Sequence, residues 1–221
     1  ANDDMRAYDG TATNVTYEYG LGFTPDFVWY KTRTQAYDHN LSDSTRGAAK
    51  QVRPNRTIAE VSATDQILSF DTGGFTVGSG GDANKDGDDY VAWCLKANGG
   101  TTSSNTDGSI TTTVQANQDS GFSIIKYDMN VTTPTAFTIG HGLSAAPELV
   151  FFFSLDQSGS TSNIVYPNNP NKEIVLDSYG AFSGATSAYW NTTAPSSTVI
   201  NMGTAWGQYY SYYGGDTIAY A

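Results

Sequence analysis

The most chemically suggestive part of the sequence is the run Asp82-Ala83-Asn84-Lys85-Asp86-Gly87-Asp88, in which an acidic or amide side chain stands at every second position. Oxygen ligands at alternate positions around a tight glycine turn are typical of loops that bind Ca²⁺. The bidentate Glu expected at the twelfth position is missing, because Trp93 stands there. A polar turn between two strands would select the same residue types, so both alternatives stay open. The candidate calcium ligands are Asp82, Asn84, Asp86 and Asp88.

A second candidate site is a group of aromatic residues near the end of the sequence. Five large rings lie within eight residues: Trp206, Tyr209, Tyr210, Tyr212 and Tyr213. Exposed rings stack on sugars and also dominate protein interfaces. We predict a strand here, with alternate rings in the core and the others outside it. Because uncharged outward rings are costly to leave in water, a subunit interface is favoured over a glycan-binding site.

Residues suited to catalysis are few. The only histidines are His39 and His141, and His141 stands in a repeated motif where the other copy has Tyr19, which indicates a structural role in a turn. The single cysteine, Cys94, lies in an apolar run and is expected to be a buried hydrophobic residue rather than a reactive thiol. Two of the acidic residues could act as a glycosidase pair, but glycan hydrolysis is the minority alternative because the periodicity of a β-helical depolymerase is absent. No catalytic residue is predicted.

Composition and charge exclude several classes of function. The net charge is −11, from 22 acidic and 11 basic residues, and such a surface repels nucleic acid and anionic membranes. Membrane insertion is not expected either, since no apolar stretch approaches the roughly 20 residues of a spanning helix. Aromatic residues make up 13% of the chain and glycine occurs 23 times, which favours short strands joined by many turns.

The elements that position these residues are organised as an internal repeat. Tyr19–Tyr30 and His141–Phe152 share, without a gap, Gly-Leu, then Pro, then an acidic residue, then four apolar positions. The closing segments correspond as well, since Asp89–Trp93 matches Asp216–Tyr220. The glycine of each Gly-Leu pair permits a turn with positive φ after a strand. Two copies of one domain are therefore expected.

The apolar runs of the repeat predict the fold class. Phe27–Tyr30 and Leu149–Phe153 are short and continuous, which indicates strands buried on both faces. A tract rich in Gly, Ser, Thr and Asn separates the two copies and is followed by the β-branched stretch 109–115. We predict an all-β protein of two tandem antiparallel, jelly-roll-like β-sandwiches. The expected domains are 1–98 and 120–221, joined by a connection over 99–119 that contains a short strand.

The motifs of the first copy carry a resemblance to a known module. Gly20–Trp29 reads Gly-Leu-Gly-Phe-x-Pro-Asp-Phe-Val-Trp, and it is followed in order by Asp43–Ala48, Ser69–Gly78 and Tyr90–Ala97. In these four pieces the chain resembles a repeated β-sandwich module of tail-fibre and other virion surface proteins of marine and cyanobacterial bacteriophages. The match covers most of residues 18–98, whereas the second copy keeps only the opening and closing motifs. The resemblance implies a virion component and supplies no catalytic residue.

These observations predict a non-enzymatic structural protein at the virion surface, in a tail fibre or a head-decorating appendage, that contributes to host attachment. The expected partners are other virion proteins, further copies of the same chain, and a glycan or protein receptor on the host surface. A secreted, lectin-like carbohydrate-binding module is the alternative. Ca²⁺ at the aspartate-rich run is the one cofactor considered. The start at Ala1 rather than Met is expected of a processed protein or of a piece of a longer one.

Overall fold

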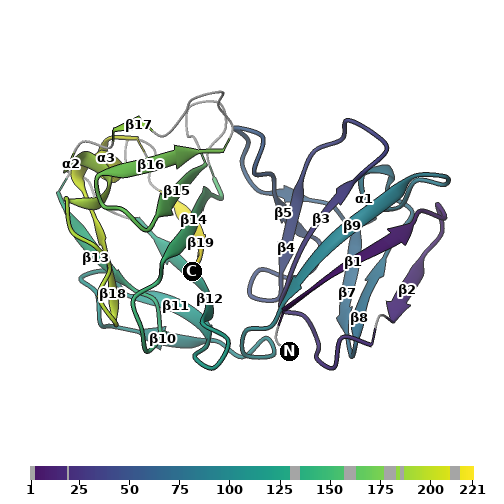
Figure 1. The fold of residues 1–221 in the computed structure, drawn as a ribbon, viewed down its shortest axis with the longest axis horizontal. Helices are drawn as coiled ribbons and strands as arrows, with labels where there is room; N and C mark the ends of the chain where they lie inside the picture. Colours follow the sequence, from purple (N-terminus) through teal and green to yellow (C-terminus); the bar gives the residue numbers. More distant parts are fainter. Residues whose placement is uncertain are drawn as a thin grey trace. The chain divides into compact units, whose positions relative to one another are not determined.

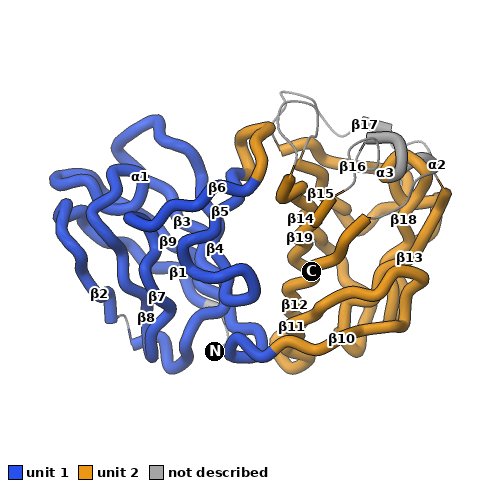
Figure 2. Tube along the Cα trace, turned by 180° about the vertical axis from the view of Figure 1, so that it is seen from behind, with its two compact units in different colours: residues 1–53, 60–101 blue, residues 54–59, 102–221 orange. Residues whose placement is uncertain are grey.

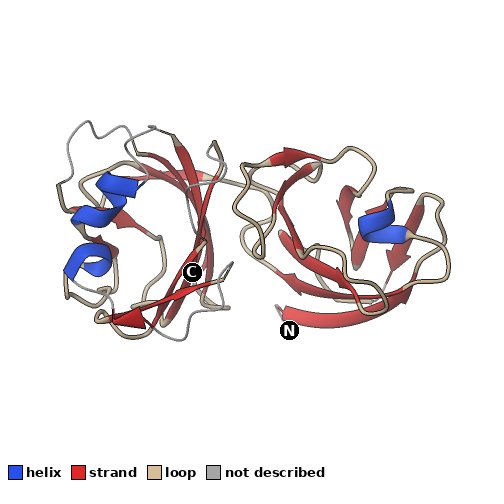
Figure 3. Ribbon diagram, turned by 90° about the horizontal axis from the view of Figure 1, so that it is seen from above, coloured by secondary structure: helices blue, strands red, loops and turns tan. Residues whose placement is uncertain are grey.

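The fold is built almost entirely from short antiparallel strands (Figures 1 and 3). The structure is a computed structural model that describes residues 3–18, 20–129, 135–156, 163–176, 183–184, 187–209 and 215–221. Its helices within these ranges are single short segments: α1 (Gly81–Asn84), α2 (Ser187–Trp190) and α3 (Thr204–Tyr209). The chain divides into two compact units, the first made of residues 1–53 and 60–101 and the second of residues 54–59 and 102–221 (Figure 2). The predicted all-β class is confirmed.

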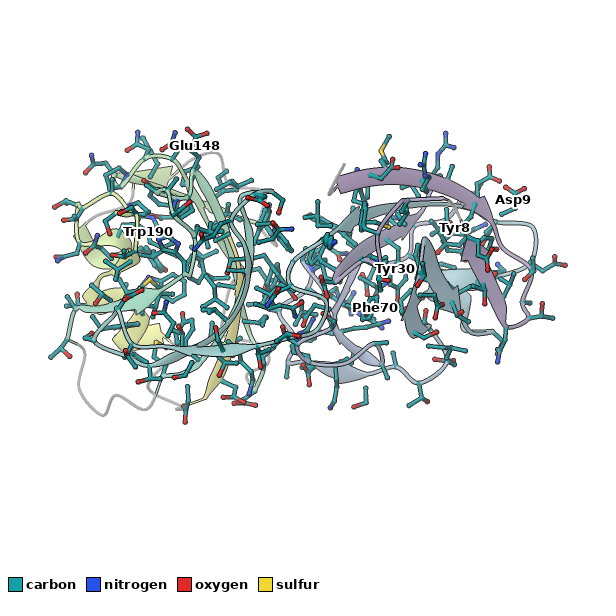
Figure 4. The ribbon with its side chains drawn as sticks, turned by 90° about the horizontal axis from the view of Figure 1, so that it is seen from below. Tyr8, Asp9, Tyr30, Phe70, Glu148 and Trp190 are labelled. Atoms are coloured by element: carbon teal, nitrogen blue, oxygen red, sulfur yellow. The ribbon has the colours of Figure 1, made fainter. Side chains whose placement is uncertain are left out.

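The first unit is a sandwich of two antiparallel sheets. In spatial order, the larger sheet contains β1 (Asp3–Asp9), β9 (Asp89–Leu95), β3 (Phe27–Thr32), β4 (Asn40–Asp43), β5 (Lys50–Val52) and β6 (Val61–Ser62). The smaller sheet contains β2 (Val15–Glu18), β8 (Gly74–Val77) and β7 (Ile67–Asp71). The core between them includes Val28, Tyr30 and Phe75, all fully buried. Figure 4 shows the ring of Tyr30 in the interior of this unit.

The second unit has the same organisation with a wider large sheet. Its strands are, in spatial order, β10 (Ser103–Asn105), β11 (Thr112–Asn117), β12 (Phe122–Asp128), β19 (Asp216–Tyr220), β14 (Leu149–Ser154), β15 (Ile164–Pro167), β16 (Lys172–Val175) and β17 (Ser183–Gly184). The smaller sheet pairs β13 (Phe137–Gly140) with β18 (Val199–Met202). Large rings dominate this core, where the ring centroids of Phe152 and Trp190 are 5.5 Å apart. Figure 4 shows Trp190 in the interior of this unit.

The two units share one strand order, as a repeat predicts. The order β1-β9-β3-β4-β5-β6 of the first unit corresponds to β12-β19-β14-β15-β16-β17 of the second. The register is conserved too, since Trp29 opposes Trp93 where Phe151 opposes Tyr220. The glycines of the two Gly-Leu pairs both have positive φ, 63° at Gly20 and 73° at Gly142. A backbone turn that glycine adopts without strain therefore begins the same segment in both copies.

The division between the units differs in detail from the expected domains. The connection expected over 99–119 is largely part of the second unit, because β10 and β11 extend its large sheet beyond β12. The register there places Val114 opposite Ile125. Residues 54–59 also belong to the second unit, where Asn163 donates its Nδ2 hydrogens to the carbonyl oxygens of Pro54 and Arg56, each at 2.9 Å.

A buried carboxylate holds the end of the first unit in place. Asp26 precedes β3 and is 1% exposed, and its two oxygens accept four hydrogen bonds. The donors are the backbone N–H groups of Ala97 (2.8 Å), Gly99 (2.9 Å) and Gly100 (2.8 Å) and the hydroxyl of Ser44 (2.7 Å). Burial of a carboxylate is tolerated here because every donor points at a charged oxygen.

A buried ion network fixes the turn after β4. The guanidinium of Arg46 contacts Asp43 at 2.5 Å and Glu60 at 3.0 Å, and the side chains of Arg46 and Asp43 are 2% and 0% exposed. Arg46 also donates to the carbonyl oxygen of Leu41 at 3.3 Å. The Asp-Ser-x-Arg-Gly piece of the sequence motif is therefore a structural unit that joins β4 to the segment before β6.

Candidate binding surface

The aspartate-rich run does not assemble as a calcium loop. Its first half forms α1 and its second half a turn. Asp82 pairs with Arg53 at 3.2 Å, while buried Asn84 donates Nδ2 hydrogens to two backbone carbonyls at 2.6 and 2.7 Å. Asp86 is exposed, and Asp88 accepts hydrogen bonds from two side chains of the turn after β3. The four side chains thus lie in different environments, and among the described residues no group of three or more His, Cys, Asp or Glu could hold a metal ion. The polar turn is the interpretation that fits.

The aromatic group near the end of the chain also differs from expectation. Tyr210, Tyr212 and Tyr213 lie outside the described residues. Trp206 and Tyr209 belong to helix α3, so the predicted strand alternation is wrong for this segment. Trp206 is fully buried and donates its Nε1 hydrogen to the carbonyl oxygen of residue 189 at 2.8 Å. Its ring packs against Phe152 and Trp190 in the core, so Trp206 is no part of an assembly surface.

Cys94 and His141 have the structural environments that the sequence indicated. Cys94 is fully buried in β9, and burial raises the pKa of its thiol to about 12. His141 is also fully buried, and its Nδ1 accepts the N–H of Leu143 at 3.1 Å while Nε2 lies 3.2 Å from the carbonyl oxygen of Ser196. This pair of contacts requires the neutral tautomer with hydrogen on Nε2. Both ring nitrogens therefore stabilise the turn after β13. Tyr19, which stands at the position of His141 in the first copy, lies outside the described residues.

The buried imidazole predicts a loss of stability on acidification. Burial lowers the pKa of His141 below its ordinary value of 6.5 in the folded chain. Because the unfolded chain then binds protons more readily, stability is fully present above about pH 6.5 and falls as the pH drops toward the folded pKa. Urea unfolding between pH 8 and pH 5 measures this. His141→Asn should flatten the profile more than His39→Asn does; equal profiles for wild type and His141→Asn would contradict the assignment.

An exposed row of apolar side chains crosses the outer side of the large sheet in the first unit. Met5 opposes Trp93, and Trp93 opposes Trp29, so the three side chains form one cross-strand row. Met5 is 58% exposed and Trp93 is 37% exposed, while Trp29 is partly exposed. We call Met5, Trp29, Trp93 and the adjoining His39 the tryptophan face.

The two indoles and the imidazole form a connected group. The rings of Trp29 and Trp93 meet edge to face at 62°, with centroids 5.9 Å apart. Trp29 donates its Nε1 hydrogen to Nδ1 of His39 at 3.0 Å, which fixes the indole orientation. Burial and the charge of Lys31 lower the pKa of His39, partly opposed by Asp38, so the imidazole stays a neutral acceptor. The result is an apolar surface whose two indoles stand on the adjacent strands β3 and β9, with Met5 on the edge strand β1.

The sequence did not single out this surface, because the run 27–30 was expected to be buried on both faces. That expectation is wrong for Trp29, which points away from the core while Val28 and Tyr30 are fully buried. It is wrong for Leu149 of the second copy as well, which is 46% exposed. The alternation of side chains along a strand could have indicated it. Successive side chains point to opposite faces, so Trp29 and Trp93, each next to core residues in its strand, must point away from the core.

The tryptophan face is suited to binding. Among the described residues four large apolar side chains are exposed, and two of them, Met5 and Trp93, lie here. Indole rings bind flat ligand surfaces, such as the apolar face of a sugar or a partner's side chain, and they lose little conformational entropy on binding. The position on paired strands keeps the rings in fixed geometry.

The fold and this surface define a protein of two tandem β-sandwiches that exposes aromatic rings from its first unit. The chain belongs to the family described as Domain of unknown function (DUF7483), whose sequence model matches residues 3–221 and so covers both units. No curated protein matches the chain, and no solved structure does. Within the described ranges, none of the helices has the length and apolar character needed to cross a membrane.

Proposed function

We propose that the chain is a non-enzymatic structural protein of a bacteriophage particle surface, in a tail fibre or head-decorating appendage, and that its tryptophan face contributes to host attachment. The observation that carries the binding role is the exposure of Met5 and Trp93 on a rigid sheet. Exposed apolar patches commonly mark interaction sites, and this one lies on a protein with a net charge of −11. The virion role is supported by the resemblance of Gly20–Trp29, a motif that leads directly into the strand bearing Trp29.

The virion role is tested on particles. An antibody raised against the chain should label the surface of purified phage particles in electron microscopy, and the chain should be present in a fixed ratio to the major capsid protein. Particles that contain no such chain would exclude the virion role while leaving a binding role for the tryptophan face intact.

The attachment role predicts that the exposed ring of Trp93 dominates binding. Trp93→Ala should weaken binding of the fluorescently labelled chain to host cells by roughly tenfold or more, because central aromatic side chains commonly carry most of an interface's energy. Leu68→Ala is the matched control, since Leu68 is an exposed apolar residue (36%) on β7 of the other sheet. Equal binding by both variants, at unchanged melting temperature, would contradict the attachment role.

A secreted, lectin-like module is the second candidate, and the edge-to-face indole pair beside His39 favours it. Rings of this kind stack on sugar faces while a neighbouring imidazole offers polar contacts to hydroxyl groups. The lectin candidate predicts saturable binding on a glycan array that is lost in Trp93→Ala. Array binding together with the absence of the chain from particles would select the lectin over the virion protein.

A further inference from the structure

We propose that two copies of the chain associate through the free edge of β1, antiparallel and with Met5 on the twofold axis. The association joins two large sheets into one continuous sheet. It concerns assembly and does not depend on the proposed virion function. Four observations on β1 lead to it: its open edge, the equivalent edge in the second unit, the order of its charges, and the exposed end of the tryptophan face.

The outward backbone groups of β1 can be assigned from its hydrogen bonds. The N–H of Gly10 donates to the carbonyl oxygen of Asp88. The backbone N–H and C=O groups of even-numbered residues therefore point toward β9. The N–H of Met5 instead donates to its own neighbour's carboxylate, Asp4 Oδ1, at 2.8 Å. The backbone N–H and C=O groups of odd-numbered residues therefore point to the open edge, at Asp3, Met5 and Ala7. When another strand pairs there, the N–H of Met5 exchanges the Asp4 carboxylate for a backbone carbonyl of that strand.

The second unit shows that this edge of the fold accepts a strand. β12 is the counterpart of β1, and β11 pairs with it antiparallel from Thr113 opposite Lys126 to Asn117 opposite Phe122. In the first unit β1 ends the sheet order among the described strands. The same edge is thus closed in one copy of the repeat and open in the other.

The charge order of β1 favours a second copy as the occupant and one register in particular. With Met5 opposite Met5, Asp4 lies opposite Arg6 of the partner subunit, and the same pair recurs on the other side of the axis. Centring the axis on residue 4 or residue 6 instead would set Asp4 against Asp4 or Arg6 against Arg6, and like charges opposite each other destabilise a sheet. Within the chain Arg6 pairs with Asp4, yet the Nε atom of Arg6 is buried without a hydrogen-bond acceptor.

The apolar row gives the association its contact area. Among the described large apolar residues Met5 is the most exposed, at 58%, and it stands at the open end of the row formed with Trp93 and Trp29. Pairing through Met5 extends this row across the axis into the same row of the second copy. One dimer then presents two tryptophan faces on a common sheet, which raises the avidity for a repetitive surface.

Charge exchange tests the register. Arg6→Asp places Asp opposite Asp, and Asp4→Arg places Arg opposite Arg, so each variant should sediment as a monomer at concentrations where the wild type is a dimer. A mixture of the two variants should form dimers again, because every Asp then faces an Arg of the other chain. The double variant Asp4→Arg/Arg6→Asp should dimerise alone. Both single variants lose the ion pair between Asp4 and Arg6 within the chain. Loss of the dimer in one variant alone could therefore follow from that loss, whereas recovery of the dimer in the mixture requires contact between the two chains.

Crosslinking tests the position of the axis. Met5→Cys should form a disulfide-linked dimer under mild oxidation, since residues opposite each other in a hydrogen-bonded pair have Cα atoms about 5.5 Å apart, within disulfide range. Ala7→Cys is the matched control, because Ala7 is exposed on the same side of β1 but would face Asp3 of the partner subunit. The native Cys94 is buried and its thiol pKa is raised to about 12, so it does not compete.

Three outcomes would overturn the proposal. A wild-type chain that stays monomeric up to the solubility limit excludes self-association. Dimers that survive both single charge variants place the contact elsewhere on the molecule. Equal crosslinking of Met5→Cys and Ala7→Cys excludes the register with Met5 on the axis.

Discussion

Arg46→Ala should lower the stability of the first unit by about 3–5 kcal/mol, the cost of removing one partner from a buried ion pair. The substitution leaves Asp43, whose side chain is 0% exposed, as an uncompensated charge in the interior. It also removes the contact of 3.0 Å to Glu60, which keeps its ion pair with Lys50. Urea unfolding of the full chain, with hydrogen exchange of the β4 amides, measures the loss.

The control for Arg46 is an exposed pair of the same charge type. Lys126 pairs with Asp216 in the second unit, and the two side chains are 35% and 38% exposed. Lys126→Ala should therefore change stability by only about 0–1 kcal/mol. If the two substitutions shifted the unfolding midpoint equally, the Arg46 network would stabilise the fold no more than an exposed ion pair does.

Asp26→Ala is expected to cost more than about 3 kcal/mol, because each hydrogen bond to a charged group contributes about 1.5–3 kcal/mol and four are lost at once. The amides of Ala97, Gly99 and Gly100 lose their acceptor and should exchange with solvent much faster. Thermal unfolding and amide exchange of the same sample give both quantities.

The repeat itself provides the control for Asp26. Glu148 occupies the equivalent position before β14 and is exposed, as Figure 4 shows at the periphery of the second unit. Glu148→Ala should leave the melting temperature nearly unchanged. An equal effect at both positions would mean that the acidic residue acts through its backbone position rather than through the buried hydrogen bonds.

The architecture could be predicted from the sequence because the repeated motif fixes it locally. Gly20 and Gly142 allow the same positive-φ turn, and the apolar residues that follow define the strands β3 and β14. Once these strands are aligned, the matching closing segments determine the sheet order and register. The fold class follows from such short-range constraints, and the β-branched stretch 109–115 indicated the strand that the structure places at β11. The pairing of β10 and β11 with the large sheet could not be predicted, because these strands have no counterpart in the other copy.

The candidate sites were predicted less well, because side-chain chemistry depends on direction. The run that ends at Asp88 has the oxygen spacing of a calcium loop, but buried Asn84 is turned into the core, where its amide holds two backbone carbonyls. Trp206 was assigned to a strand, yet it lies in α3 and fills the core with Trp190. Neither orientation is visible in the residue types alone.

The first unit begins and ends at the same end of its large sheet, because Asp3 opposes Leu95 across β1 and β9. A mechanical load that pulls these two points apart would strain the interstrand hydrogen bonds one after another, which needs far less force than shearing them together. Asp26 binds the chain just beyond Leu95, at residues 97–100. Its hydrogen bonds are in series with the β1–β9 ladder, and the weaker of two links in series yields first. The ladder bonds are therefore expected to open one by one while the four bonds to the Asp26 carboxylate hold.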